Sequence, residues 1–190
     1  LSVYYTNFHN VQSQAIICYG DRLTHFTDFV RQLHMESLGK KTKIDGNPVN
    51  VNTGNVIWGG SGSDGQHSYF QLLHQGTYTI PIDFIVDAGV SDDQMDTYSL
   101  ANCLAQSESL MAGIQEADPE RSIDGDKPNN VIFVNKLSPQ SIGQLVALYE
   151  HKVFVQSIIY GINAFDQYGV ELGKKIAQSL SKVISKSSRY

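Results

Sequence analysis

Three short segments of the chain carry side chains suited to proton transfer. In the first segment, Glu36 follows Leu33 by three residues and Phe29 by seven, so on a helix it projects along the apolar stripe that those residues define. A carboxylate directed toward the protein interior suits a general base that works near neutral pH. The same pattern also fits a helix that frays before Gly39 and leaves Glu36 in water. Gln32 lies one turn earlier and would share the neighbourhood.

The second segment is a glycine-rich loop between a predicted strand and a predicted helix. Gly60, Gly62 and Gly65 satisfy the GxGxxG spacing. Asp87 ends the next predicted strand, at about the 20-residue separation of a dinucleotide fingerprint. Asp64 weighs against that reading, because its carboxylate lies where a pyrophosphate would approach and would repel it.

His67 ends the same loop. The glycines favour a sharp turn that presents this histidine at the N-terminus of the next helix, where the positive end of the helix dipole disfavours an imidazolium ion. That position would tune an acid–base role, although a single histidine in a first helical turn is also commonly structural. His74 lies two turns further on, but no third ligand accompanies the pair, so the spacing argues against a metal site.

The third segment runs from Asn163 to Lys174. Asp166 is the expected N-cap of a last helix. On that helix Gln167, Glu171 and Lys174 would share one face, which would present an amide, an acid and a base. An exposed ion pair between Glu171 and Lys174 is the simpler explanation of the last two residues.

Short apolar runs alternate with helical patterns along the chain and indicate the elements that position these segments. The order strand, helix, strand, helix predicts an α/β fold: a doubly wound, mainly parallel sheet flanked by helices, with its ligand crevice beyond the carboxyl ends of the strands. Asp21 should cap the first of these helices and Gly39 should end it. Strands are expected at 15–19, 56–58, 82–86 and 131–134, helices at 22–38, 66–75, 95–114 and 141–162, and a surface excursion at 117–130.

Composition narrows the classes of function. The chain has 190 residues, 41% of them hydrophobic, which is enough for about one domain with a sizeable core. Its formal net charge of −5 argues against nucleic acid or a membrane surface as the main partner. Cys18 and Cys103 lie far apart without metal-ligand spacing, which fits reduced thiols in the cytoplasm. No apolar run approaches the ~20 residues of a membrane span.

The end of the chain has a pattern of its own. Apolar side chains recur at helical spacing over residues 170–184, with lysines between them. This pattern predicts a terminal helix that buries its apolar side and keeps its lysines in water. We therefore expect one domain over residues 1–165 and a C-terminal helix over residues 166–190 that packs on it.

Together and in this order, the three segments resemble one family, the phosphoglucose isomerases (glucose-6-phosphate isomerases). The resemblance covers the whole chain but only the C-terminal part of the family's polypeptide, namely the second of its two sugar-isomerase (SIS) domains and the C-terminal helices. The chain begins with Leu1 rather than Met, and we expect it to be a piece of a longer protein from which the N-terminal SIS domain is absent. The matching segments are QLHMESLGK at 32–40 for the catalytic glutamate, GSDGQH at 62–67 and LHQGT at 73–77 for the catalytic histidine, and INAFDQYGVELGK at 162–174 for the C-terminal signature.

The resemblance implies an aldose–ketose isomerase that interconverts glucose 6-phosphate and fructose 6-phosphate through a cis-enediol. It assigns Glu36 as the base that moves the proton between C2 and C1. It assigns His67 to opening of the sugar ring, with Lys174 assisting at the ring oxygen, and places Gln32 and Gln167 in the substrate pocket. It further implies no cofactor, no metal and a homodimer in which the histidine of each site comes from the neighbouring subunit.

Two other classes of function stay open at this point. One is a dinucleotide-binding module that uses Gly60 to Gly65 together with Asp87, and the other is a non-catalytic sugar-phosphate-binding domain. The resemblance also suggests a strained backbone from Gly62 to Asp64, with a cis peptide before Ser63. Finally, it places the phosphate-gripping loop and an enediolate-stabilising arginine upstream of Leu1, so the 190 residues alone should fold but show little activity.

Overall fold

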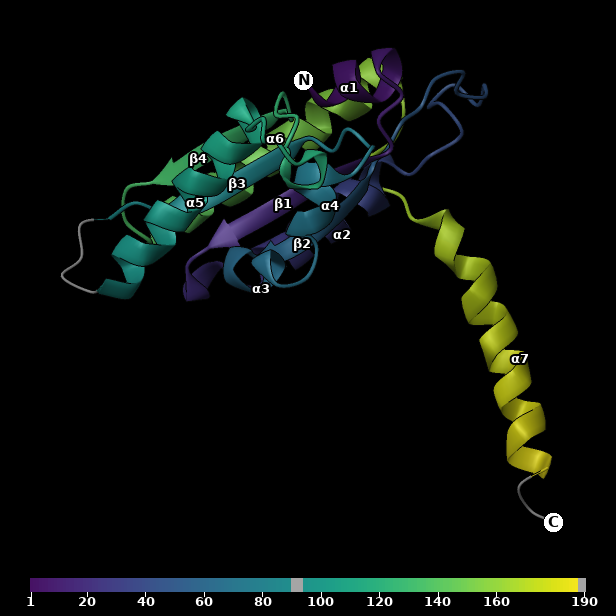
Figure 1. Cartoon of the computed structure of the whole chain (residues 1–190). Coiled ribbons are helices and arrows are strands. Elements are labelled where there is room, and N and C mark those ends of the chain that lie inside the picture. The colour runs from purple at the N-terminus through teal and green to yellow at the C-terminus, as the bar shows by residue number, and fades with distance from the viewer. Residues whose placement is uncertain (90–93, 188–190) are drawn as a thin grey trace.

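A four-stranded parallel sheet forms the centre of the molecule. The computed structural model describes residues 1–89 and 94–187, and the sheet has the order β2-β1-β3-β4. Figure 1 shows the strands running side by side between layers of helices. This arrangement confirms the predicted α/β fold. The strands are β1 (Ser13–Tyr19), β2 (Val56–Ser61), β3 (Ile82–Asp87) and β4 (Asn129–Val134).

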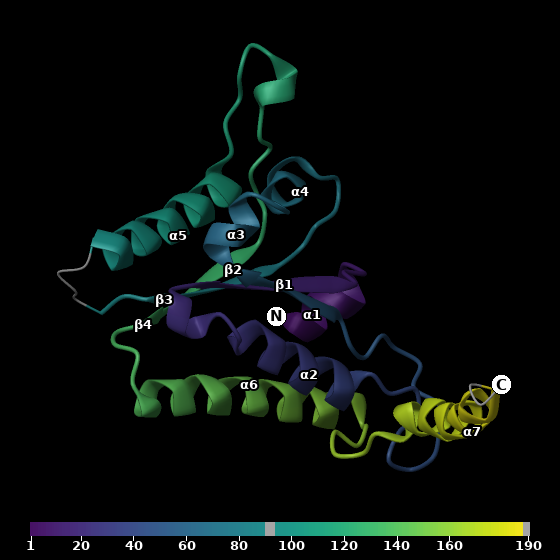
Figure 2. The same ribbon diagram turned by 90° about the horizontal axis from the view of Figure 1, so that it is seen from below.

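Helices cover both faces of the sheet. Figure 2 shows α3, α4 and α5 on one side and α2 and α6 on the other. A short helix, α1 (Ser2–Phe8), precedes the sheet and α7 (Glu171–Ser187) ends the described chain. The covering helices are α2 (Phe26–Leu38), α3 (Gly62–Gln66), α4 (Phe70–Gln75), α5 (Gln94–Ala112) and α6 (Pro139–Tyr160), and single 3-10 turns lie at η1 (Asp21–Leu23), η2 (Pro119–Arg121) and η3 (Tyr168–Val170).

The two-sided cover explains why the strands read as continuous apolar runs. Ala15 and Ile17 pack into the core beneath α4 and α5, whereas Ile16 and Cys18 pack into the core beneath α2 and α6. Successive side chains of a strand point to opposite faces, so a strand buried on both faces must be apolar at nearly every position. The sequence therefore located all four strands, within a few residues at each end.

The boundaries of α6 and the end of α2 follow local signals, but the start of α2 does not. Helix α6 begins with a capping box between Ser138 and Ser141 and ends at Gly161, whose φ of 69° is left-handed. Helix α2 ends at Gly39, as predicted. The prediction that Asp21 caps α2 is wrong, because the chain leaves β1 through the turn η1 and α2 begins later, at Phe26.

The predicted surface excursion forms over residues 117–128, and β4 begins at Asn129. Figure 2 shows this segment, with η2, rising away from the helical layer beside α5. Ile114 and Ile123 form an isolated antiparallel bridge at its base. The rest of the excursion is mostly exposed, as expected for a loop outside the core.

A C-terminal helix forms, but it begins at Glu171 rather than at residue 166, and in the described chain it does not pack on the domain. In Figures 1 and 2, α7 extends away from the sheet and its covering helices. Its apolar stripe includes Leu172, Ile176 and Leu180, which are 67%, 50% and 55% exposed. The segment that joins α6 to α7 directs the helix outward, so the side chains of Leu172, Ile176 and Leu180 stay largely exposed in the described chain. Residues 188–190 of the expected C-terminal unit lie outside the described residues. Within the described chain, every helix is too short or too polar to span a bilayer.

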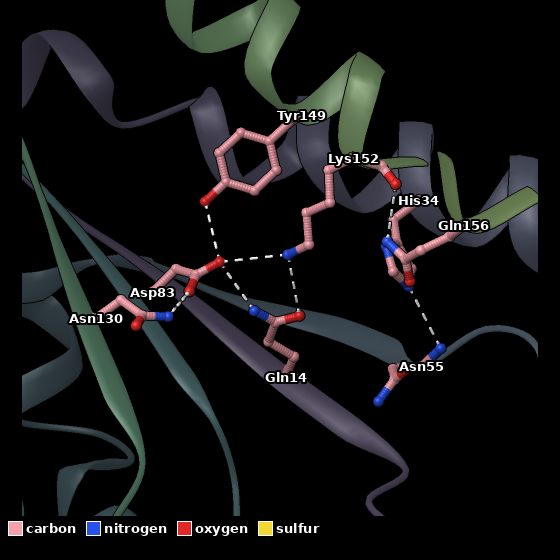
Figure 3. A network of polar contacts seen from close by, with 8 residues as sticks. All are labelled: Gln14, His34, Asn55, Asp83, Asn130, Tyr149, Lys152 and Gln156. Atoms are coloured by element: carbon pink, nitrogen blue, oxygen red, sulfur yellow. Dashed lines mark hydrogen bonds and ion pairs between the residues drawn. The ribbon is translucent and has the colours of Figure 1, made fainter. Parts of the chain in front are cut away.

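A buried carboxylate ties three strands to α6 near the amino ends of the strands. Asp83 accepts hydrogen bonds from Gln14 Nε2 at 2.9 Å, Asn130 Nδ2 at 2.9 Å and the Tyr149 hydroxyl at 3.2 Å. Lys152 Nζ lies 3.4 Å from Asp83 Oδ2 (Figure 3). Burial and the Asp83 charge raise the pKa of the Tyr149 hydroxyl far above its usual range, so Tyr149 remains a donor. These partners compensate for the desolvation of the Asp83 charge.

His34 lies buried on α2 beside this network. Its Nε2 accepts a hydrogen bond from the Asn55 amide at 3.4 Å, which joins α2 to the start of β2 (Figure 3). Burial, and secondarily the charge of Lys152, lowers the pKa of His34 to about 4. The neutral imidazole is therefore the form that the folded chain holds near neutral pH.

The lowered pKa of His34 predicts an acid-sensitive stability. The unfolded imidazole titrates near pH ~6.5, so the stabilising contribution of neutral His34 is complete above that pH and is lost as the pH falls toward 4. We expect this contribution to be about 3 kcal/mol in the free energy of unfolding, measured by urea titration between neutral and acidic pH.

His34→Gln should reduce this pH dependence, and His25→Gln should not, because the His25 side chain is 92% exposed. Parallel loss of stability in the wild-type protein and His34→Gln would contradict the assignment to His34.

Candidate active site

A cavity of about 1180 Å³ lies at the C-terminal end of α2. Its wall combines the last turn of α2, part of the 39–53 loop and the 163–170 segment that follows α6. Helix α2 connects two parallel strands and so runs back along the sheet, which brings its end to the edge where the strands begin. The sequence predicted the ligand crevice at the opposite edge, beyond the carboxyl ends of the strands. That expectation is wrong for this cavity.

Glu36 lines the cavity from α2 and is half-buried. Gln32 donates a hydrogen bond from Nε2 to Glu36 Oε2 at 3.2 Å, so the two side chains are paired one turn apart on the helix. The helix continues to Leu38, which excludes fraying before Gly39. The two predicted residues of this segment are therefore together, with the carboxylate held at the wall of a cavity.

Gln167 lines the same cavity from the segment after α6. It precedes η3 with φ −146° and ψ 34°, so it is not part of a helix shared with Glu171 and Lys174. Lys174 lies on α7 and is exposed. The prediction that Asp166 caps the last helix is wrong, because α7 begins at Glu171 and the Asp166 carboxylate lies 3.4 Å from Lys40 Nζ instead.

His67 lies near the edge of the sheet where the strands end, opposite the edge that carries the cavity. It follows the last residue of α3, and its backbone amide donates to the Asp64 carbonyl at 3.2 Å. The expected position at a helix N-terminus is wrong, because α3 already starts at Gly62, with Ser61 as its N-cap. His67 is exposed to solvent.

Glu36 and His67 do not form one site within this chain. Figure 1 shows α3, which precedes His67, near the arrowheads of the strands, and the chain leaves for α7 at the other end of the sheet. The described chain thus brings together Glu36, Gln32 and Gln167, and it leaves His67 apart from them.

Comparisons with known proteins identify the chain's relatives. The family model described as phosphoglucose isomerase matches residues 1–190. The chain belongs to this family. It is 44% identical to a glucose-6-phosphate isomerase of Ectopseudomonas mendocina, an alignment that covers 99% of the chain and 38% of the relative. It is 48% identical to a glucose-6-phosphate isomerase of Pseudomonas fluorescens strain SBW25, covering 95% and 36%.

Solved structures extend the same comparison. A crystal structure of a glucose-6-phosphate isomerase from Chlamydia trachomatis superposes with a TM-score of 0.90 at 36% identity, covering 97% of this chain and 37% of that one. A hypothetical protein from Thermus thermophilus superposes with a TM-score of 0.71 at 22% identity, a likeness of fold alone. The chain therefore spans somewhat more than a third of the length of the phosphoglucose isomerases that it matches.

The glycine-rich loop of this family member is arranged poorly for a dinucleotide. Asp87, the candidate ribose ligand, accepts from Arg22 Nη2 at 2.9 Å and from the Gly89 amide at 3.1 Å. The Ser61 hydroxyl occupies the helix N-terminus by accepting from the Asp64 amide at 3.4 Å. These contacts satisfy groups that a bound ribose and pyrophosphate would need.

The unusual backbone of this loop lies earlier than expected. Within residues 1–89 and 94–187 no peptide bond is cis, so the expected cis bond before Ser63 is wrong. The left-handed positions are Gly59 and Gly60, with φ of 121° and 147°. A Cβ at Gly59 would lie 2.2 Å from the Ile16 carbonyl oxygen, so β2 can approach β1 closely only with glycine there.

Sequence reasoning missed Lys40. A lysine just beyond the end of a helix is a known partner for the last helical carbonyls, so its contact with α2 had a signal in the sequence. Its second partner, Asp166, lies 126 positions away and had none.

Proposed function

We propose that the chain supplies the proton-transfer residues of a glucose-6-phosphate isomerase. One observation carries the proposal: Glu36, which accepts a hydrogen bond from Gln32, lines a cavity together with Gln167, in a chain that belongs to the phosphoglucose isomerase family. In this proposal Glu36 is the base, and Gln32 and Gln167 bind the sugar. His67 opens the sugar ring, and Lys174 assists at the ring oxygen.

The chemistry fits a carboxylate of this kind. Isomerisation requires removal of the proton on C2, next to the aldehyde, and delivery of a proton to C1, with a cis-enediol between the two steps. One carboxylate can perform both transfers, because it accepts the proton in the first step and returns it in the second. The hydrogen bond from Gln32 would hold Glu36 in one orientation for both.

Ring opening needs a second acid–base group, and we propose that it comes from another subunit. The placement of His67 and Glu36 near opposite edges of one sheet supports this arrangement, because a single chain does not unite them. A homodimer would pair Glu36 of one subunit with His67 of its partner. A cytoplasmic enzyme is consistent with Cys18 and Cys103, both buried and free.

The base assignment predicts a specific loss of turnover. The measurement uses a chimaera in which residues 1–190 replace the matching segment of the Pseudomonas fluorescens SBW25 relative, to which the chain is 48% identical. Glu36→Gln in this chimaera should lower kcat for glucose 6-phosphate by at least ~10³-fold with little change in KM, because the amide keeps the shape but cannot accept a proton.

Glu108→Gln is the matched control, a carboxylate on α5 outside the cavity wall, and it should leave kcat unchanged. Retained turnover in Glu36→Gln would mean that the domain binds sugar phosphate without performing the chemistry.

The two-subunit site predicts complementation between inactive variants. When Glu36→Gln and His67→Ala chimaeras are unfolded and refolded together, half of the dimers should be mixed, and each mixed dimer should contain one intact site. We expect recovery of about a quarter of the parental activity, measured against each variant refolded alone. No recovery would indicate that both residues act from the same chain.

The isolated 190-residue chain should be a weak catalyst. The phosphate grip and the enediolate-stabilising arginine that the family resemblance implies are not among its segments, and loss of one preorganised charge-stabilising donor alone typically costs ~10²–10³ in rate. We expect its kcat/KM, measured with mass-verified protein, to fall at least ~10²-fold below that of the chimaera. Comparable rates for the two proteins would contradict this.

A further inference from the structure

The ammonium group of Lys40 closes the end of the helix that carries Glu36. Lys40 Nζ donates to the Glu36 carbonyl oxygen at 2.7 Å and to the Ser37 carbonyl oxygen at 3.3 Å. Carbonyls in the last turn of a helix have no partner within the helix and carry the negative end of its dipole. A cation there both satisfies and stabilises the turn that holds Glu36.

The same ammonium group reaches across the cavity wall to the segment after α6. Lys40 Nζ lies 2.7 Å from the Asp166 carbonyl oxygen and 3.4 Å from Asp166 Oδ1. The side chains of Lys40 and Asp166 are 14% and 25% exposed, so water screens this contact less than it screens a surface ion pair. One group therefore binds main-chain oxygens on both sides of the cavity.

The segment that Lys40 reaches needs such a contact. Residues 163–167 contain no helix or strand, and the Phe165 amide turns back to Asn163 Oδ1 at 3.0 Å within the segment itself. Gln167 comes directly after Asp166, and η3 and α7 follow it. The position of Gln167 relative to Glu36 thus depends on how residue 166 is fixed to α2.

We infer that Lys40 is a positioning residue that fixes Gln167 relative to Glu36. It acts through main-chain contacts with Glu36 and Asp166 and does not need to touch the substrate. The expected effect of Lys40 on catalysis rests on the proposed function. The link that Lys40 makes between α2 and residue 166 does not depend on it. Displacement of a substrate-positioning group by about 1 Å can cost ~10²-fold in rate, so a loosened link would be visible in turnover.

Lys41 provides a matched control for charge and location. It is the next residue, it lines the same cavity and its side chain is exposed. Lys41→Met removes the same charge as Lys40→Met from the same cavity wall. A general effect of positive charge in the cavity would change both variants, whereas loss of the link between α2 and residue 166 would change only Lys40→Met.

The first experiment measures the link in the 190-residue chain itself. Spin labels are attached at Gly143→Cys on α6 and Gly169→Cys beside Gln167, two positions where an added Cβ meets nothing within 4 Å. The native Cys18 and Cys103 are buried and should remain unlabelled. Pulsed electron paramagnetic resonance then measures the distribution of distances between the two labels. This distribution should be roughly twice as wide in Lys40→Met as in the parent. It should be unchanged in Lys41→Met and close to that of the parent in Lys40→Arg.

An equally narrow distribution in Lys40→Met, or equal broadening in Lys41→Met, would overturn the inference. If Lys40→Met does not fold, Lys40→Gln takes its place, since the shorter neutral amide removes the ammonium group that donates to the Glu36 and Asp166 carbonyl oxygens. Lys40→Gln should then broaden the distribution in the same direction, and an unchanged width would overturn the inference.

The second experiment measures turnover in the chimaera defined above. Lys40→Met should lower kcat by about 10- to 100-fold while KM changes by less than about threefold, and Lys40→Arg should recover most of the loss. An unchanged kcat would overturn the catalytic consequence. An inactive parental chimaera would count against the proposed function alone, and the label distances would still decide whether Lys40 holds the segment.

Discussion

The parallel sheet imposes the arrangement on which everything else depends. A parallel strand that is followed by another needs a connection that returns the chain to the edge where strands begin, and α2 is such a connection between β1 and β2. Helix α6 follows the last strand, β4, and runs beside α2 on the same face of the sheet (Figure 2). Both helices therefore deliver their C-terminal ends to the same edge of the sheet. That is why residues 32–40 and 163–170, so distant in sequence, enclose one cavity. The loop after β2 stays near the opposite edge, and His67 with it.

Much of this fold was predictable because its signals are local and repeated. The continuous apolar runs of β1 and β3 result directly from burial on both faces, and Gly39 ends α2 as its position indicated. The wrong predictions concern the starts of helices, where a short turn can form in place of the predicted helix start. Asp21 begins a 3-10 turn instead of capping α2, and the helix of the glycine-rich loop, α3, ends at Gln66, directly before His67. Sequence pattern does not resolve such choices, because they depend on how the strand before them ends.

Sequence pattern indicated part of the cavity wall but not its geometry. Helical spacing placed Gln32 beside Glu36, and the structure pairs them at 3.2 Å. The meeting of Glu36 with Gln167 and the contact of Lys40 with Asp166 depend on tertiary packing across more than a hundred residues, which periodicity does not encode. The same limit applies to α7. The spacing of its apolar residues predicts that one side of the helix is buried, but it does not indicate which surface covers that side. In the described chain the side chains of Leu172, Ile176 and Leu180 are exposed.

The carboxylate of Asp83 has a consequence for the order in which the molecule assembles. Its partners come from β1, β4 and α6, so the charge is compensated only when all of these elements have docked correctly. If β4 paired one residue out of register, Asn130 would turn to the opposite face and leave a donor missing. A misaligned sheet would thus bury a poorly solvated anion. The Asp83 charge therefore disfavours strand pairings that are out of register. Folding intermediates without α6 would keep this edge of the sheet hydrated.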